Sequence, residues 1–208
     1  PSQVVDELCE YGYDHKGGLP RLICFVVYGQ NPNSGTTNMA GAIREAEAIK
    51  KEFPEQRIAF VGSHMSALPR EVLKHDCVDF VFTNEGVYAL HNLLRLGTWD
   101  SDTLYKVKGI GWKTVGVNDE ECHVLNPPES LVPNDLMDVD LPGYAWDLLP
   151  YREKPFDLYR SHFWHADYDH SRRTPFAAIY TSLGCRFQCE FCMINIVTVS
   201  YTHLTLPT

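Results

Sequence analysis

The chain has 208 residues, which is enough for one or two domains with a sizeable hydrophobic core. Hydrophobic residues make up 44% and charged residues 22%, the composition of an ordinary globular protein. The formal net charge of −9 argues against a nucleic-acid partner, because binding to a phosphate backbone needs a basic face. No apolar run is long enough for a membrane helix, so we expect no membrane span and a cytoplasmic location.

Strands and helices are expected to alternate through the N-terminal half. Continuous apolar runs predict buried strands, and apolar residues at helical spacing predict the helices between them. The predicted elements are, in chain order, a strand over 22–28, a helix over 39–53, a strand over 57–61, a short helix over 68–74, a strand over 78–82 and a helix over 87–96. This alternation predicts a parallel sheet in an open α/β fold.

Glycine and small polar residues follow each of the three predicted strands, in loops at 29–35, 62–66 and 84–86. In open α/β sheets, ligands bind in the loops outside the carboxyl ends of the strands. The alternative for each loop is that its glycine only turns the chain. The candidate cofactor contacts in these loops are Gly29, Gly62, Ser63, Glu85 and Gly86.

After residue 98 the sequence changes character. The segments 105–112 and 114–125 predict a small hairpin with its turn near 118–120, and a proline-containing connector follows. A new strand is predicted over 176–181. We therefore expect an α/β domain over 1–97, a linker with a hairpin over 98–175, the start of a second domain over 176–198 and a non-native tail over 199–208.

Three of the seven cysteines follow this last strand directly, with the spacing C-x3-C-x2-C: Cys185, Cys189 and Cys192. Thiolates are soft ligands, and three on one short loop can converge on an iron–sulfur cluster. Three thiolates leave one iron of a 4Fe-4S cluster without a protein ligand. An open coordination position is where a substrate or cofactor can bind, as at catalytic zinc sites.

Two other interpretations of the cysteine motif stay open. A zinc site could be completed by His162, His165 or His170, and the thiols could also have clustered by chance. Elsewhere, Cys24 lies within an apolar run and Cys77 directly before one, so both are expected to be buried, inert thiols.

The cysteine motif resembles the signature of the radical SAM superfamily, in which a strand and a glycine precede C-x3-C-x-aromatic-C, and Phe191 is the aromatic residue here. The earlier segments Val61-Gly62-Ser63-His64 and Phe80-Val81-Phe82-Thr83-Asn84-Glu85-Gly86 resemble the end of the cobalamin-binding domain of one branch. The resemblance covers roughly residues 22–195. It implies a partial flavodoxin- or Rossmann-like cobalamin-binding domain, a linker, and the first strand of a radical SAM (β/α) barrel.

The resemblance also implies cofactors and a reaction. The three cysteines would bind three irons of a 4Fe-4S cluster, and the fourth iron would chelate S-adenosyl-L-methionine, with Phe191 close to the adenine. An electron from an external donor such as flavodoxin or ferredoxin would cleave that cofactor to methionine and a 5′-deoxyadenosyl radical. The radical would abstract hydrogen from a small-molecule or biosynthetic-intermediate substrate. In the cobalamin branch, the expected outcome is methylation of an unactivated carbon.

Two alternative functions stay open beside this cobalamin-dependent methyltransferase. One is a radical SAM enzyme without cobalamin, and the other is a non-catalytic zinc-binding module. Only 16 residues follow Cys192, whereas a barrel of this kind needs roughly 200. We therefore expect the chain to be an inactive fragment of a longer parent enzyme.

Overall fold

The computed structural model describes residues 2–14, 18–28, 34–116, 118–143 and 145–148, together with residues 182, 183, 187, 189, 190, 202 and 203. The chain divides into two compact units. The first comprises 1–132 and 184–201, and the second comprises 133–183 and 202–208.

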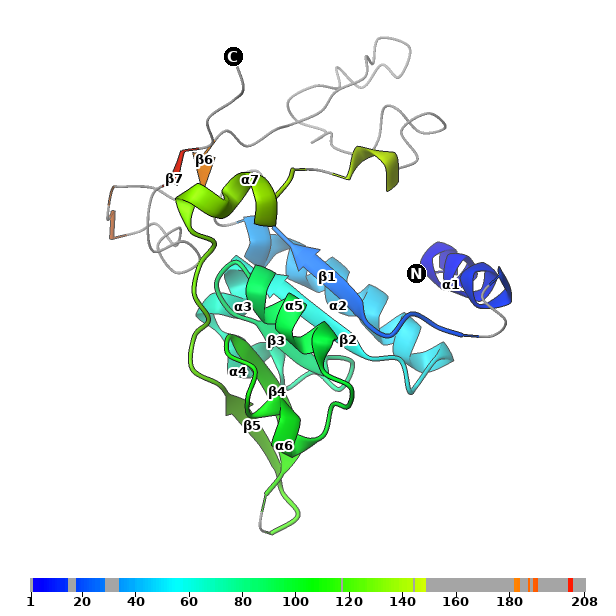
Figure 1. The fold of residues 1–208 in the computed structure, drawn as a ribbon. Helices are drawn as coiled ribbons and strands as arrows, with labels where there is room; N and C mark the ends of the chain where they lie inside the picture. The colour runs from blue at the N-terminus through cyan, green and yellow to red at the C-terminus, as the bar shows by residue number, and fades with distance from the viewer. Residues whose placement is uncertain are drawn as a thin grey trace. The chain divides into compact units, whose positions relative to one another are not determined.

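A five-stranded mixed sheet forms the centre of the first unit (Figure 1). Its strands lie in chain order: β1 (Ile23–Val27), β2 (Ile58–Gly62), β3 (Phe80–Phe82), β4 (Ile110–Val115) and β5 (Glu121–Leu125). The first three strands are parallel, and β4 and β5 are antiparallel to their neighbours. The α/β class and the parallel pairing of the three alternating strands are thus confirmed, and the sheet is mixed because the predicted hairpin adds two antiparallel strands to it.

The predicted hairpin is β4 and β5, with its turn near Asp119, which has a positive φ of 59°. It was expected within a linker, but β4 pairs with β3 and extends the sheet. Ile110 and Trp112 of β4 are 1% and 2% exposed, which explains the pairing, since a free two-stranded hairpin buries too little to be stable. The first unit accordingly continues past the expected boundary at residue 97, as far as Val132.

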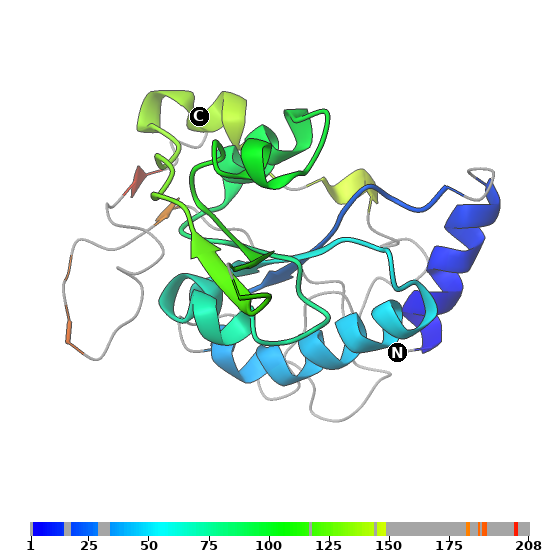
Figure 2. The same cartoon turned by 90° about the horizontal axis from the view of Figure 1, so that it is seen from below.

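Helices cover both faces of the sheet (Figure 2). On one face lie α2 (Ser34–Glu52), α3 (Ser63–Ala67) and α4 (Pro69–Val72), and on the other lie α5 (Val87–Arg95) and α6 (Ser101–Leu104). Successive side chains of a strand point to opposite faces. In β2, Ile58 and Phe60 therefore join the core cluster beneath α2, whereas Ala59 and Val61 join the cluster beneath α5.

The N-terminal helix α1 (Ser2–Asp14) was missed by the sequence analysis, in which this segment was a polar opening. Its side chains Val5 and Leu8, three positions apart, pack against the cluster beneath α2. Two apolar residues make a stripe too narrow to predict a helix by itself. Packing against α2 is what supplies the rest of its stability.

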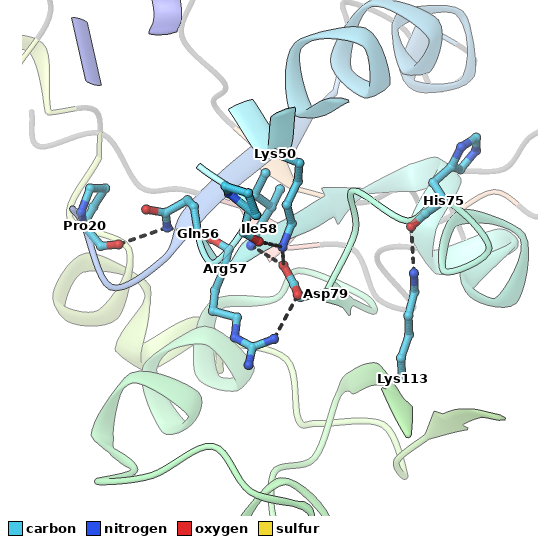
Figure 3. A network of polar contacts seen from close by, with 9 residues as sticks. Pro20, Lys50, Gln56, Arg57, Ile58, His75, Asp79 and Lys113 are labelled. Carbon is cyan, nitrogen blue, oxygen red and sulfur yellow. Dashed lines mark hydrogen bonds and ion pairs between the residues drawn. The ribbon is translucent and has the colours of Figure 1, made fainter. Parts of the chain in front are cut away.

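A network of polar contacts lies at the amino end of the parallel strands, centred on Asp79 (Figure 3). Its Oδ2 accepts a hydrogen bond from the Ile58 N–H at 2.8 Å and pairs with Lys50 Nζ at 2.9 Å. Its Oδ1 pairs with Arg57 at 3.0 Å. The side chains of Asp79 and Lys50 are only 14% and 18% exposed, so water screens this ion pair weakly. One carboxylate therefore joins the end of α2 to the starts of β2 and β3.

The described part of the second unit consists of short elements. These are η1 (Asn134–Leu136), α7 (Met137–Asp140), η2 (Trp146–Leu148) and the antiparallel pair β6 (Ser182–Leu183) and β7 (Thr202–His203). The predicted strand over 176–181 and the histidines at 162, 165 and 170 lie outside the described residues. No helix in the described part of the chain has the length and apolar character that crossing a membrane requires.

Candidate functional site

The three parallel strands end at one edge of the sheet, which we call the carboxyl edge (Figure 1). Val27 at the end of β1 is paired with Gly62 at the end of β2, and Phe82 at the end of β3 is paired with Val61. The residues that follow these strands are therefore held near one another. This is the edge at which open α/β sheets bind ligands.

The structure brings four of the predicted cofactor contacts to the carboxyl edge: Gly62, Ser63, Glu85 and Gly86. Of the three predicted cluster ligands it describes Cys189, which is exposed and makes no disulfide. The predicted residues that lie outside the described ones are Gly29, Cys185, Phe191 and Cys192.

Gly62 ends β2 in a conformation that favours glycine, with φ at 148°. A Cβ placed on it would lie 2.2 Å from the carbonyl oxygen of Val27 and 3.0 Å from Met65 Cε. The glycine therefore lets the ends of β1 and β2 approach each other. This packing role accounts for Gly62 without a ligand.

Gly86 has a similar role at the start of α5. It caps the helix with φ at 73°, and a Cβ on it would lie 2.7 Å from Val61 Cγ2 and 3.1 Å from Phe82 Cβ. Asn84 also has a positive φ, of 58°. Two left-handed residues thus make the tight turn from β3 into α5, and the protein itself fills the space beside Gly86.

Glu85 lies between these two left-handed residues and is half-buried. Its Oε2 accepts a hydrogen bond from the Val132 N–H at 3.1 Å. Burial raises the pKa of the Glu85 carboxyl, and the hydrogen bond from Val132 partly opposes this shift. The carboxylate therefore has a partner within the protein, which the sequence analysis could not identify because Val132 is far away in the chain.

Tyr28 follows β1 at the same edge and is 38% exposed. Burial of its hydroxyl end, followed by repulsion from the Glu85 carboxylate and from Cys24, raises the pKa of Tyr28 to about 12. The phenol is therefore protonated at neutral pH and available as a hydrogen-bond donor.

A second polar contact at this edge joins α2 to α3. Thr36 Oγ1 lies 3.1 Å from His64 Nδ1, and Asn38 Nδ2 donates to the backbone oxygen of Tyr28 at 2.9 Å. Neither contact was expected from the sequence, although His64 lies within the predicted ligand loop 62–66. The His64 imidazole and the Tyr28 phenol thus lie at this edge, where they can hold a ligand through hydrogen bonds.

The cysteine motif fits an iron–sulfur cluster by the chemistry of its donors. Three soft thiolates at close spacing in the sequence are the ligand type that such clusters need. Among the described residues, no three His, Cys, Asp or Glu side chains gather as a metal-binding group, and Cys185 and Cys192 lie outside those residues.

Cys77 and Cys24 were expected to be buried, inert thiols, and the structure largely agrees. Cys77 is 3% exposed, and burial raises its pKa. Cys24 is half-buried, and burial raises its pKa to about 11. Both thiols are therefore protonated at neutral pH, which makes them poor nucleophiles and poor metal ligands.

A shallow hollow of about 390 Å³ lies at the other end of the strands, lined by residues 19–21 and 52–57. These residues precede β1 and β2, whereas the predicted cofactor contacts follow these strands. The hollow is therefore separate from the carboxyl edge.

No protein-family model matches this chain, and a search of curated proteins found no match. Function is therefore inferred from the residues and their geometry alone.

The packing role of Gly62 can be tested with two glycine-to-alanine variants, one at Gly62 and one at a control position. Gly62→Ala puts a methyl group against the Val27 carbonyl at a φ that disfavours alanine, so we expect the free energy of unfolding to fall by about 3 kcal/mol. Gly41→Ala in α2 is the matched control, because nothing lies within 4 Å of its added Cβ, and we expect a gain of about 0.5–1 kcal/mol. Urea unfolding followed by circular dichroism measures both. Equal stability of Gly62→Ala and wild type would contradict the packing role.

The raised pKa of Glu85 predicts a pH-dependent stability. A carboxyl whose pKa folding raises stabilises the fold below its unfolded pKa, and this contribution is lost as the pH rises through the raised value. Glu85→Gln keeps an oxygen acceptor for Val132 and removes the buried charge. We expect this variant to melt at a higher temperature than wild type at about pH 7.5, and the difference to shrink at about pH 4. A difference that grows towards acid would contradict the assignment.

Proposed function

We propose that this chain is part of a radical SAM enzyme in which Cys185, Cys189 and Cys192 hold a 4Fe-4S cluster. The observation that carries the proposal is the C-x3-C-x2-C motif, whose three thiolates leave one iron open. When bound, such a cluster supplies the iron that chelates S-adenosyl-L-methionine and the electron that cleaves it.

The chain's own residues have separate tasks in this proposal. The three thiolates bind and orient the cluster, and Phe191, directly before the third cysteine, offers an aromatic face to the adenine. The electron comes from an external donor such as flavodoxin or ferredoxin. The substrate is a small molecule or a biosynthetic intermediate.

A narrower proposal concerns the first unit, which we infer to be a cobalamin-binding platform, with methylation of an unactivated carbon as the reaction. The support is the carboxyl edge of three parallel strands, with His64 and Tyr28 beside it. Gly62 and Gly86 add no support, because internal packing accounts for both. The alternative is a radical SAM enzyme in which this unit is only a scaffold.

The cluster is tested by anaerobic reconstitution with iron and sulfide. We expect wild type to bind about four irons per chain and to give a 4Fe-4S electron paramagnetic resonance signal after reduction with dithionite. Cys189→Ala should lose this signal, because two thiolates hold the cluster poorly. The matched control is Cys122→Ala, which removes an exposed thiol of β5 and should keep the signal.

The same preparations separate the alternatives. S-adenosyl-L-methionine should change the signal of wild type, because it binds the open iron. Stoichiometric zinc with no cluster would exclude the radical chemistry and leave a non-catalytic zinc-binding module. Retention of hydroxocobalamin through gel filtration, equal in wild type and Cys189→Ala, would support the platform. Its loss from both, with the cluster intact, would leave a radical SAM enzyme without cobalamin.

A further inference from the structure

Residues 126–132 follow β5 outside any helix or strand, and we call them the strap. The strap is tied to the first unit at its start. Asn126 Nδ2 donates to the carbonyl oxygens of Leu104 and Val107, both at 2.7 Å, and the Asn126 N–H donates to the Ile110 oxygen at 2.9 Å. The hydrogen bonds of Asn126 thus join the end of α6 to the beginning of β4.

The middle of the strap is held at two further points. The Gly109 N–H donates to the carbonyl oxygen of Pro127 at 2.7 Å, and Asn92 Nδ2 of α5 donates to Glu129 Oε2 at 3.1 Å. The contact at Gly109 is close, because a Cβ there would lie 2.8 Å from Glu129 Cβ. The strap therefore lies directly against the backbone that precedes β4.

The strap ends at the carboxyl edge. Val132 is 4% exposed, and its N–H donates to Glu85 Oε2 at 3.1 Å. The turn that carries Glu85 contains the left-handed residues Asn84 and Gly86, one on each side of it. A carboxylate is a strong acceptor for a backbone N–H, so Glu85 offers a preorganised partner at this point.

We propose that the strap is a positioning device and that Glu85 is its latch. The Glu85 carboxylate holds Val132 at the carboxyl edge, and this fixes the place from which the chain continues beyond the first unit. Glu85 is then a positioning residue and not the cofactor contact expected from the sequence. The latch requires neither a cluster nor cobalamin, so it stands or falls separately from the proposed function.

Hydrogen exchange of the backbone amides in the intact chain tests the latch. We expect Glu85→Ala to accelerate exchange of the Val132 amide at least tenfold, while the amides of β2 and β3 keep their protection. Glu85→Gln keeps an acceptor oxygen and should restore the protection of Val132. The matched control is Glu121→Ala, which removes a carboxylate that contacts His123 within β5. It should leave the exchange rate of the Val132 amide unchanged.

Two results would overturn the proposal. One is a Val132 amide that exchanges as fast in wild type as in Glu85→Ala, and the other is a failure of Glu85→Gln to restore protection. If Glu85→Ala does not fold, Asn92→Ala provides the test, because it removes only the hydrogen bond that joins the Glu129 side chain to α5. We expect it to accelerate exchange of the backbone amides of residues 129–131 several-fold, and no change there would also overturn the strap.

Discussion

The first unit depends on β2, a strand whose five residues are all buried. It pairs with β1 on one side and with β3 on the other, and its side chains alternate between the two core clusters. A slip of one residue would exchange the clusters, so both ends of this strand must be set. Asp79 sets the beginning by accepting the N–H of Ile58, and Gly62 sets the end by admitting the Val27 carbonyl.

The polar edge of the sheet follows from this constraint. Because β1, β2 and β3 are held in register, the residues after them have no freedom to separate, and Tyr28, His64 and Glu85 gather at one edge. The pKa of Tyr28 rises to about 12 partly because the Glu85 carboxylate lies near it. The strap reaches the same edge at Val132. The residues proposed to hold a ligand and the last residue of the strap therefore lie at the same edge of the sheet.

The antiparallel hairpin completes the unit for a different reason. The short β3 has apolar side chains on both faces, and β4 covers its outer edge through the pairs Phe80–Trp112 and Phe82–Ile110. Without β4, the cluster beneath α5 would lose both of its buried side chains from that strand. Residues 126–132 leave β5 as the strap, which contacts α5, α6 and the start of β4.

Local patterns in the sequence determined the α/β class, the helices α2 and α5 and the turn of the hairpin. They also placed the ends of the parallel strands to within two residues. These features could be predicted because apolar runs and helical spacing report which side chains must be buried. The sequence also contains the cysteine motif, and the proposed iron–sulfur cluster rests on the spacing of its three cysteines. Tertiary structure alone decided the direction of β4, the docking of α1 and the partners of Gly62 and Glu85. Each of these depends on an atom distant in the chain, such as the Val27 carbonyl or the Val132 N–H, and a local pattern carries no information about such partners.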